Sequence, residues 1–167
     1  MPESWVWYRL SSLWELVSGR DLTPSEYGDN DIGIPYITGA SNFFDDNLII
    51  NRWTINPKVM AKSGDLLITC KGTVGTMVMN TQGDVHIARQ IMAIRNLYNL
   101  NIHFLKIVLA SFVQQIILAA KGIIPGISRD DILDIIIPCP PLKEQERIVQ
   151  AANNVEARLN DISKNLS

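Results

Sequence analysis

The chain has little cysteine and no recognisable metal or redox motif. Only two cysteines occur, Cys70 and Cys139, and neither belongs to a CxxC pair. The sequence therefore supports neither a disulfide framework nor a zinc site, and both residues are predicted to be small buried hydrophobes. His86 and His103 have no partners at metal-ligand spacing, so we expect surface or capping histidines and no bound metal.

The sequence also lacks an apolar run of about 18 residues, the length that a membrane-spanning helix needs. The longest candidate, residues 107–120, is too short and is broken by two glutamines. The first residues, MPESW, show neither the basic nor the apolar region of a signal peptide. We therefore expect no membrane association and a cytoplasmic location.

Catalytic signatures are absent as well. The chain has no GxxxxGK[ST] phosphate loop, no GxSxG serine motif and no Asn-Pro-Pro-aromatic tetrapeptide of amino-methyltransferases. Near Asp65 and Lys71, Thr69 stands where a nuclease of the acid–lysine type would carry a carboxylate. We predict no catalytic residues, no cofactor on this chain and no enzymatic activity.

Charge is present, but it is unevenly distributed along the chain. The net charge is −2, yet residues 52–129 hold nine basic and two acidic residues, whereas residues 1–51 hold two basic and eight acidic ones. A basic centre between acidic flanks can form one positive face for a phosphate backbone. The alternative, that these charges point in all directions, stays open.

Hydrophobic periodicity predicts a mixture of strands and helices. The mixed order favours an α+β fold over a doubly wound parallel sheet. Residues 20–33 and 39–47 are rich in turn formers and predict loops. The predicted elements are a short helix with Leu10, Leu13, Trp14 and Val17 on one face, a strand at 34–38, a hairpin of 66–69 and 76–79, one or two strands within 85–96, a buried core helix at 101–120 with Asn101 as N-cap, a short helix capped by Ser128 and Asp131, and a buried strand at 134–138.

A long helix is predicted from Leu142 to the end of the chain, directly after Pro140 and Pro141. At ~1.5 Å per residue it would be about 39 Å long. Its apolar residues step by four and three, as in the seam of a coiled coil, which predicts pairing with a partner helix. The alternative is a helix folded back onto its own domain. The predicted pairing residues are Ile148, Ala152, Val155, Leu159, Ile162 and Leu166.

Two units follow from this pattern: a globular domain over residues 1–140, with a mixed β-sheet and packed helices, and a C-terminal coiled-coil-type helix over residues 141–167.

Several stretches of both units together resemble one family, the target-recognition domains of the specificity (S) subunits of type I restriction-modification enzymes. The stretches are MPESWVWYRLSSLWELVSGRDLTP, IPYITGASNF, GDLLITCKGTVGT, HIARQIMAI and GISRDDILDIIIPCPPLKEQERIV. The last, with its Pro-Leu-x-Glu-Gln-x-x-Ile exit motif, is the most specific.

The resemblance implies that the chain reads double-stranded DNA, while partner subunits carry the chemistry. Modification subunits would bind S-adenosylmethionine and methylate adenine, and a restriction subunit would use ATP and Mg for translocation and cleavage. S chains of this family carry two recognition domains and two antiparallel spacer helices. With one of each, this chain is predicted to be a half-subunit that forms a homodimer, or one part of a longer S chain.

Side-chain chemistry then suggests which residues contact DNA. Lysines suit phosphates, whereas arginine and glutamine can make paired hydrogen bonds to guanine or adenine edges. Predicted phosphate contacts are Lys58, Lys62 and Lys106. Predicted base contacts are Arg20, Arg52, Lys71, Arg89, Gln90 and Arg129, and Thr23, Ser41, Asn42 and Thr73 are predicted to add hydrogen bonds.

Two other functions remain open at this point. The chain could be the recognition domain of a single-chain restriction-methylation enzyme, which methyltransferase motifs upstream in the gene would favour. It could also be a helix-mediated protein-interaction module without DNA binding, which a failure to bind any duplex would favour.

Overall fold

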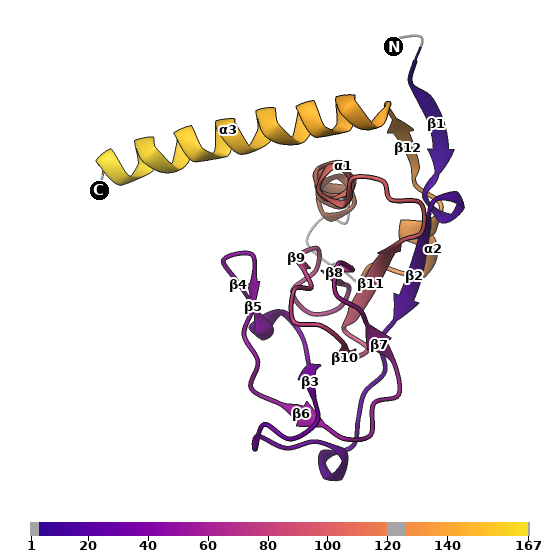
Figure 1. Ribbon diagram of the computed structural model, residues 1–167, viewed down its shortest axis with the longest axis vertical. Helices are drawn as coiled ribbons and strands as arrows, with labels where there is room; N and C mark the ends of the chain where they lie inside the picture. Colours follow the sequence, from indigo (N-terminus) through magenta and orange to yellow (C-terminus); the bar gives the residue numbers. More distant parts are fainter. Residues whose placement is uncertain (1–3, 120–125, 167) are drawn as a thin grey trace.

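The computed structural model of the chain describes residues 4–119 and 126–166. The fold is α+β, as the sequence predicts, with mixed sheets, packed helices and a long C-terminal helix (Figure 1). The strands are β1 (Val6–Arg9), β2 (Trp14–Ser18), β3 (Ile34–Ile37), β4 (Phe43–Phe44), β5 (Asn47–Leu48), β6 (Trp53–Thr54), β7 (Met60–Ala61), β8 (Leu66–Thr69), β9 (Met77–Met79), β10 (Val85–Ile87), β11 (Ile91–Asn96) and β12 (Ile136–Cys139). The α-helices are α1 (Ile102–Ala119), α2 (Arg129–Leu133) and α3 (Leu142–Leu166), and short 3-10 helices span Leu10–Ser12, Pro24–Glu26 and Ala40–Asn42.

The centre of the domain is a four-stranded antiparallel sheet in the order β2-β11-β8-β9. Alternate residues of a strand point to opposite faces, and this sheet is covered on both. Leu66 and Ile68 belong to the apolar cluster that includes Leu109 of α1, whereas Leu67 and Ala93 belong to a second cluster with the neighbouring sheet. Burial on both faces explains why β8 has three consecutive apolar residues, Leu66, Leu67 and Ile68, before the buried Thr69.

A second sheet, in the order β6-β3-β10-β7, lies on the side of the central sheet away from α1 (Figure 1). Its one parallel pair joins β10 to β3, with His86 opposite Tyr36, and its other pairs are antiparallel. Ile37 and Ile87, which are both fully buried, connect it to the cluster around Leu67. The two sheets and α1 therefore form three layers.

The N-terminal strand and the start of α3 are joined at the top of the domain. β1 pairs with β12 in an antiparallel ribbon, and α3 begins directly after β12 (Figure 1). Gln145 of α3 is almost fully buried: its Oε1 accepts the backbone N–H of Asn101 at 3.1 Å, and its Nε2 donates to the carbonyl of Pro140 at 2.8 Å. The first turn of α3 is therefore fixed to the start of α1.

Most predicted elements are confirmed. The strand at β3, the hairpin β8–β9, the pair β10 and β11, and α3 lie where the sequence places them. Asn101 caps α1, since its Oδ1 accepts the N–H groups of His103 and Phe104. Ser128 and Asp131 form the predicted capping box of α2. The predicted last residue of the α1 segment, Ala120, lies outside the described residues.

The predicted helix over residues 10–17 is wrong. This segment forms a 3-10 turn and then strand β2, which pairs with β11 over five residues. The spacing of Leu10, Trp14 and Val17 fits a helix, but Trp14 and Leu16 are buried and Glu15 between them is exposed, which is the period of a strand. The local sequence fits a helix and a strand equally well, and pairing with β11 at the edge of the central sheet makes the segment a strand.

Two predictions of complete burial are also wrong. In β12, Ile136 is 53% exposed, because the strand lies in a two-stranded ribbon that is buried on one face only. In α1, Ile107 and Leu118 are exposed, because the sheet covers one side of the helix. No helix in the described part of the chain is long and apolar enough to cross a membrane.

A buried carboxylate locks the end of the central sheet at which β8 begins. Asp65 is 2% exposed, and its oxygens accept Nε and Nη2 of Arg95 at 3.2 and 2.9 Å and the backbone N–H of Lys62 at 2.8 Å. Arg95 also lies 3.3 Å from Glu15. Hydrogen bonding to Asp65 raises the pKa of Arg95 further above its ordinary value. The cluster ties β2, β11 and β8 together.

Replacing Asp65 by asparagine is expected to destabilise the fold. The change keeps the shape but removes the buried counter-charge of a largely covered guanidinium, which then has only the exposed Glu15 as an ion-pair partner; the cost is about 3 kcal/mol. The melting temperature should fall by about 10 °C, measured by thermal unfolding. The exposed Asp84→Asn change is the control and should leave the melting temperature almost unchanged. Equal melting temperatures for the two variants would contradict the role of Asp65.

Candidate nucleic-acid interface

Three loops meet at the other end of the central sheet. The pairs Ser18 with Met92 and Ile91 with Thr69 show that β2 ends, β11 begins and β8 ends at the same edge. The segments 19–22, 88–90 and 70–76 therefore come together although they are far apart in the sequence. Together with the first turn of α2 they carry six of the predicted contact residues, which we call the loop-end cluster: Arg20, Lys71, Thr73, Arg89, Gln90 and Arg129, all exposed.

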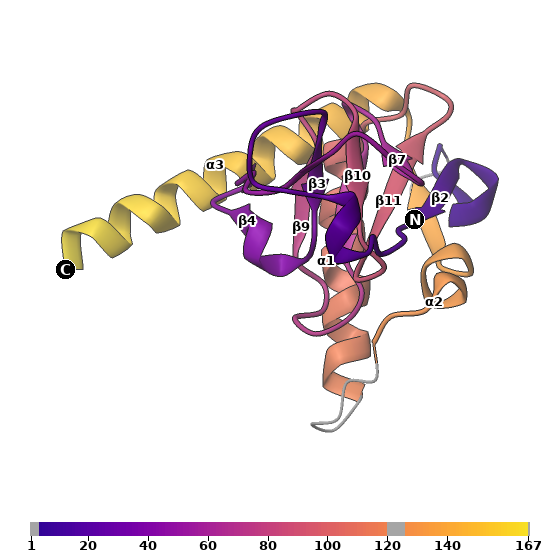
Figure 2. The same ribbon diagram turned by 90° about the horizontal axis from the view of Figure 1, so that it is seen from below.

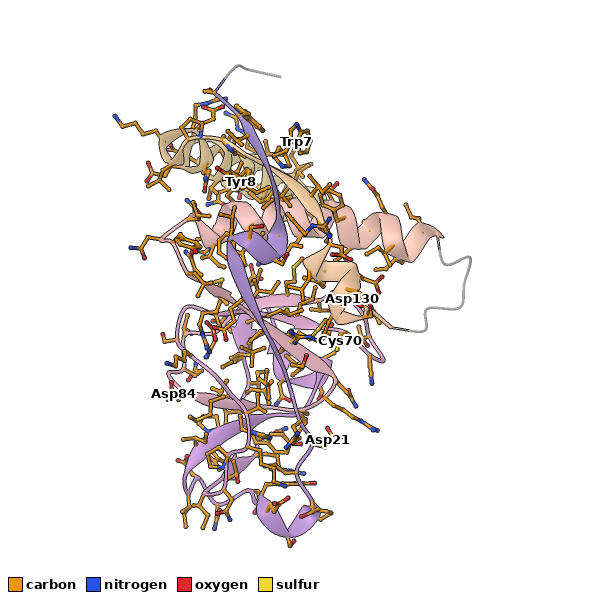
Figure 3. All side chains as sticks on the ribbon, turned by 90° about the vertical axis from the view of Figure 1, so that its right-hand side faces the viewer. Trp7, Tyr8, Asp21, Cys70, Asp84 and Asp130 are labelled. Atoms are coloured by element: carbon orange, nitrogen blue, oxygen red, sulfur yellow. The ribbon has the colours of Figure 1, made fainter. Side chains whose placement is uncertain are left out.

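Backbone hydrogen bonds hold these loops against one another. The N–H of Arg20 donates to the carbonyl of Ile87 at 2.9 Å, and the N–H of Cys70 donates to the carbonyl of Gln90 at 2.7 Å. A Cβ on Gly19 would lie 2.0 Å from the carbonyl oxygen of Ala88, so only glycine permits this approach. In Figure 3 the labels of Asp130, Cys70 and Asp21 mark α2, the start of segment 70–76 and segment 19–22, one below the other. The backbone of this surface is therefore fixed.

Arg129 joins the loop-end cluster from α2. Its Nη1 donates to the carbonyl of Leu16 at 3.0 Å and to Oγ of Ser18 at 2.7 Å, which ties the start of α2 to the end of β2. The backbone N–H of Ile127 donates to the carbonyl of Cys70, so the approach to α2 also lies beside Lys71. Arg129 thus has a structural contact in addition to its exposed surface.

Of the two predicted residues at 41 and 42, the structure leaves only one exposed. A Cβ on Gly39 would lie 2.7 Å from Oε1 of Gln90, which places the turn that carries exposed Ser41 beside the loop-end cluster. Asn42 is fully buried, and its amide accepts the N–H of Thr38 and donates to the carbonyl of Ile49. Asn42 has no surface for a base and is not part of the proposed contact set, because its amide is used to hold the turn.

Five other predicted residues are not part of the loop-end cluster. Lys58 forms an ion pair with Glu26 at 2.6 Å, and hydrogen bonds from Lys58 and Thr23 lower the pKa of Glu26 to about 2. Thr23 itself belongs to the capping box of the 3-10 helix at Pro24–Glu26. Lys62 precedes the start of β8, at the opposite end of the sheet from Lys71. Arg52 is exposed beside β6 and donates to the carbonyl of Asn51. Lys106, on α1, forms an ion pair with Asp46 at 2.6 Å.

His86 lies beneath this surface and is fully buried, so the expected surface or capping role is wrong. Its Nδ1 accepts the N–H of Val59 at 3.3 Å, which leaves the proton on Nε2 to bond the carbonyl of Arg20 at 2.8 Å. Its ring lies 4.9 Å from that of Tyr36. Burial lowers the pKa of His86, so the neutral form supports the Arg20 loop. The signal in the sequence was its place between two apolar β-branched residues.

A pH dependence of stability follows from the lowered pKa of His86. Between the ordinary pKa of about 6.5 and the lower folded value, the unfolded chain binds a proton that the folded chain rejects. Stability is therefore fully present above that range and falls as the pH drops through it. The melting temperature of the wild type should decrease from pH 7.5 to 5.5, and His86→Gln should show a smaller decrease. The exposed His103→Gln variant is the control and should keep the wild-type pH profile.

Helix α3 is only partly covered by its own domain. Its first half crosses α1, where Lys106, Ile107, Val149 and Ala152 help to line a groove of about 300 Å³. Its second half extends beyond the domain in both Figures 1 and 2. There, Val155, Leu159 and Ile162 are 57%, 60% and 56% exposed, while the side chain of Leu166 lies outside the described part. The folded-back alternative thus holds for the first half, and an unpartnered apolar stripe remains on the second.

No group of three or more potential metal ligands occurs within residues 4–119 and 126–166. The arrangement instead offers fixed loops with exposed guanidinium, ammonium and amide groups, which suit recognition of an anionic polymer.

Comparisons with known proteins found related sequences that match almost the whole chain. A family model described as type I restriction modification DNA specificity domain matches residues 2–167. A curated relative from Methanocaldococcus jannaschii, named as the MjaX specificity subunit of a type I restriction enzyme, is 24% identical over 162 residues, covering 93% of this chain and 37% of the relative.

Solved structures share the fold. The HsdS subunit from Thermoanaerobacter tengcongensis matches with a TM-score of 0.88 and 24% identity, over 100% of this chain and 41% of that one. A chain from a study of complex assembly and conformational transition of the type I R-M system matches with 0.88 and 26%, over 98% and 41%. The S subunit from M. genitalium matches with 0.69 and 16%, over 98% and 42%. The chain thus spans about two fifths of the length of these relatives.

Proposed function

Because this chain belongs to the family of type I restriction modification DNA specificity domains, we propose that it is a sequence-specific DNA-recognition subunit or half-subunit. In this role it directs adenine methylation and cleavage by partner modification and restriction subunits. The observation that carries the proposal is the loop-end cluster, in which a rigid antiparallel sheet presents basic and amide side chains from four separate segments.

The two parts of the chain have different tasks in this proposal. The globular domain up to residue 140 contacts DNA through the loop-end cluster and Ser41. The helix from residue 141 onward sets the distance to a second recognition domain and offers a surface to modification subunits. S-adenosylmethionine, ATP and Mg belong to the partner subunits, and this chain acts by binding alone.

The direct test is to sequence the methylome of a host that carries this chain together with its modification partner. The expected result is methylated adenine within one defined motif that disappears when the chain is deleted. A methylome that is unchanged by the deletion would overturn the proposed function. Methylation without the chain but with the partner would also do so.

Lys71→Ala is expected to weaken binding to all duplexes alike. Lys71 is among the base contacts predicted from the sequence, but its exposed ammonium group in the β8–β9 turn equally suits a phosphate. In that case its loss should reduce the slope of log affinity against log salt by about one. The measurement is a salt titration of the complex with modification subunits on a duplex that contains the motif. Lys62→Ala removes an equal charge at the far end of β8 and should leave the slope unchanged. Equal effects of both variants would show that only net charge matters.

The exposed stripe on α3 fits a second copy of the same helix. The seam positions are symmetric about residue 157, so an antiparallel pair places Val155 against Leu159 and Ala152 against Ile162 of the second copy. The small Ala152, which lies in the groove beside α1, would receive the larger Ile162. This pairing would cover the apolar surface that the domain leaves open and would hold two recognition domains at a fixed separation.

Leu159→Glu is expected to abolish this homodimer, because it places a charge in the centre of the seam on both helices. Sedimentation velocity should show a dimer for the wild type and a monomer for the variant. Ala157→Glu, on the opposite face of α3, is the control and should remain dimeric. A wild-type chain that stays monomeric at high concentration would contradict homodimerisation and would favour pairing with a helix of another S segment.

A further inference from the structure

The turn between β10 and β11 presents two side chains on a fixed backbone. Arg89 and Gln90 are exposed at its tip, while Ala88 and Ile91 on either side are buried. The N–H of Ile91 donates to the carbonyl of Ala88 at 2.9 Å, and the N–H of Ala88 donates to the carbonyl of Ile37 at 2.9 Å. These hydrogen bonds and the buried residues on either side define the position from which the Arg89 side chain extends.

Asp21 holds the side chain of Arg89 as well as its backbone. Its Oδ1 accepts the backbone N–H of Arg89 at 3.0 Å, and its Oδ2 lies 2.8 Å from Nε of the same residue. The carboxylate therefore contacts both the backbone of Arg89 and the inner nitrogen of its guanidinium, which restricts the direction of the side chain. Asp21 is itself held, because the N–H of Arg20 before it bonds Ile87 and the N–H of Leu22 after it bonds the hydroxyl of Tyr36.

The contact with Asp21 uses Nε and leaves the outer edge of the guanidinium available. The structure gives Nη1 and Nη2 of Arg89 no partner among the described residues, and the side chain is 68% exposed. An arginine in this state presents two parallel N–H donors. Two such donors match the O6 and N7 acceptors of guanine in the major groove, and lysine cannot reproduce them.

We propose that Arg89 reads a guanine through Nη1 and Nη2, and that Asp21 is the positioning residue that orients it. The inference rests on the proposed function and adds to it a specific residue and a specific base. It also explains the closeness of Gly19 to Ala88. A side chain at Gly19 would force the Asp21 loop away from the turn that carries Arg89.

The test uses the complex of this chain with its modification partner. Once the methylated motif is known, methyl transfer is measured on four duplexes that differ only at one guanine position, for each guanine of the motif. Arg89→Ala and Arg89→Lys should each reduce discrimination at one guanine position by about tenfold or more, with the other positions unchanged. Asp21→Asn should reduce discrimination at that same position, since the asparagine oxygen can still accept the Arg89 N–H but the charge opposite Nε is lost.

The double variant Asp21→Asn with Arg89→Ala separates positioning from general damage. If Asp21 acts through Arg89, the double variant should lose no more discrimination than Arg89→Ala alone. The exposed pair of Arg9 and Asp134, 2.5 Å apart, is the matched control. Arg9→Ala and Asp134→Asn should keep the wild-type motif. Melting temperatures of all variants confirm that they are folded.

Several results would overturn the inference while leaving the proposed function intact. These are a wild-type motif without guanine, an unchanged guanine preference in the Arg89 variants, or an equal loss on all four duplexes, which indicates a phosphate contact. Losses at different positions for Asp21→Asn and Arg89→Ala would overturn the positioning role. A wild type that methylates no motif would overturn the proposed function, and the inference with it.

Discussion

The antiparallel register of the central sheet is the constraint on which the rest of the structure depends. Because β2 ends where β11 begins and β8 ends, the three loops of residues 19–22, 70–76 and 88–90 reach the same end of the sheet. The backbone hydrogen bonds among these loops then follow, as does the burial of His86 below them. At the opposite end of the sheet, the ion pair of Asp65 and Arg95 connects the strands. The two ends therefore differ: an ion pair stabilises one, and exposed side chains occupy the other.

The layered core allows this separation. β8 is buried on both faces, between α1 on one side and the second sheet on the other, so the strand positions are fixed by packing. Of segment 70–76, Cys70 belongs to the first cluster and Val74 packs against it, whereas Arg89 and Gln90 belong to neither cluster. Side chains at the tips, such as Arg89 and Gln90, can therefore differ without altering the core, as expected when binding residues lie on loops held by a rigid scaffold. Under the proposed function, different tip residues on the same scaffold would contact different base sequences.

The sequence predicted those elements whose patterns are decided locally. The hairpin β8–β9 has apolar runs on either side of two glycines, and α1 and α2 have caps that can be read from Asn101 and Ser128. It failed at β2, where helical and strand spacing coincide and only the partner strand β11 decides. For the surface, residue type alone could not distinguish Asn42, which is buried, from Ser41, which is exposed. Nor could it show that Lys58 is paired with Glu26, since that contact joins residues 32 positions apart. The grouping of Arg20, Lys71 and Arg89 required the sheet register, which no local pattern contains.

Buried Gln145 fixes α3 at one end only, and this has a mechanical consequence. From Gln145 to Leu166 the helix extends about 31 Å, at ~1.5 Å per residue. A tilt of about 10° at the glutamine would displace the far end by about 5 Å, which is more than the distance between adjacent base pairs, ~3.4 Å along one strand. The two hydrogen bonds of the Gln145 amide, to Asn101 and Pro140, and the packing of the first half of α3 across α1 thus together limit the range of directions in which the far end of the helix can point.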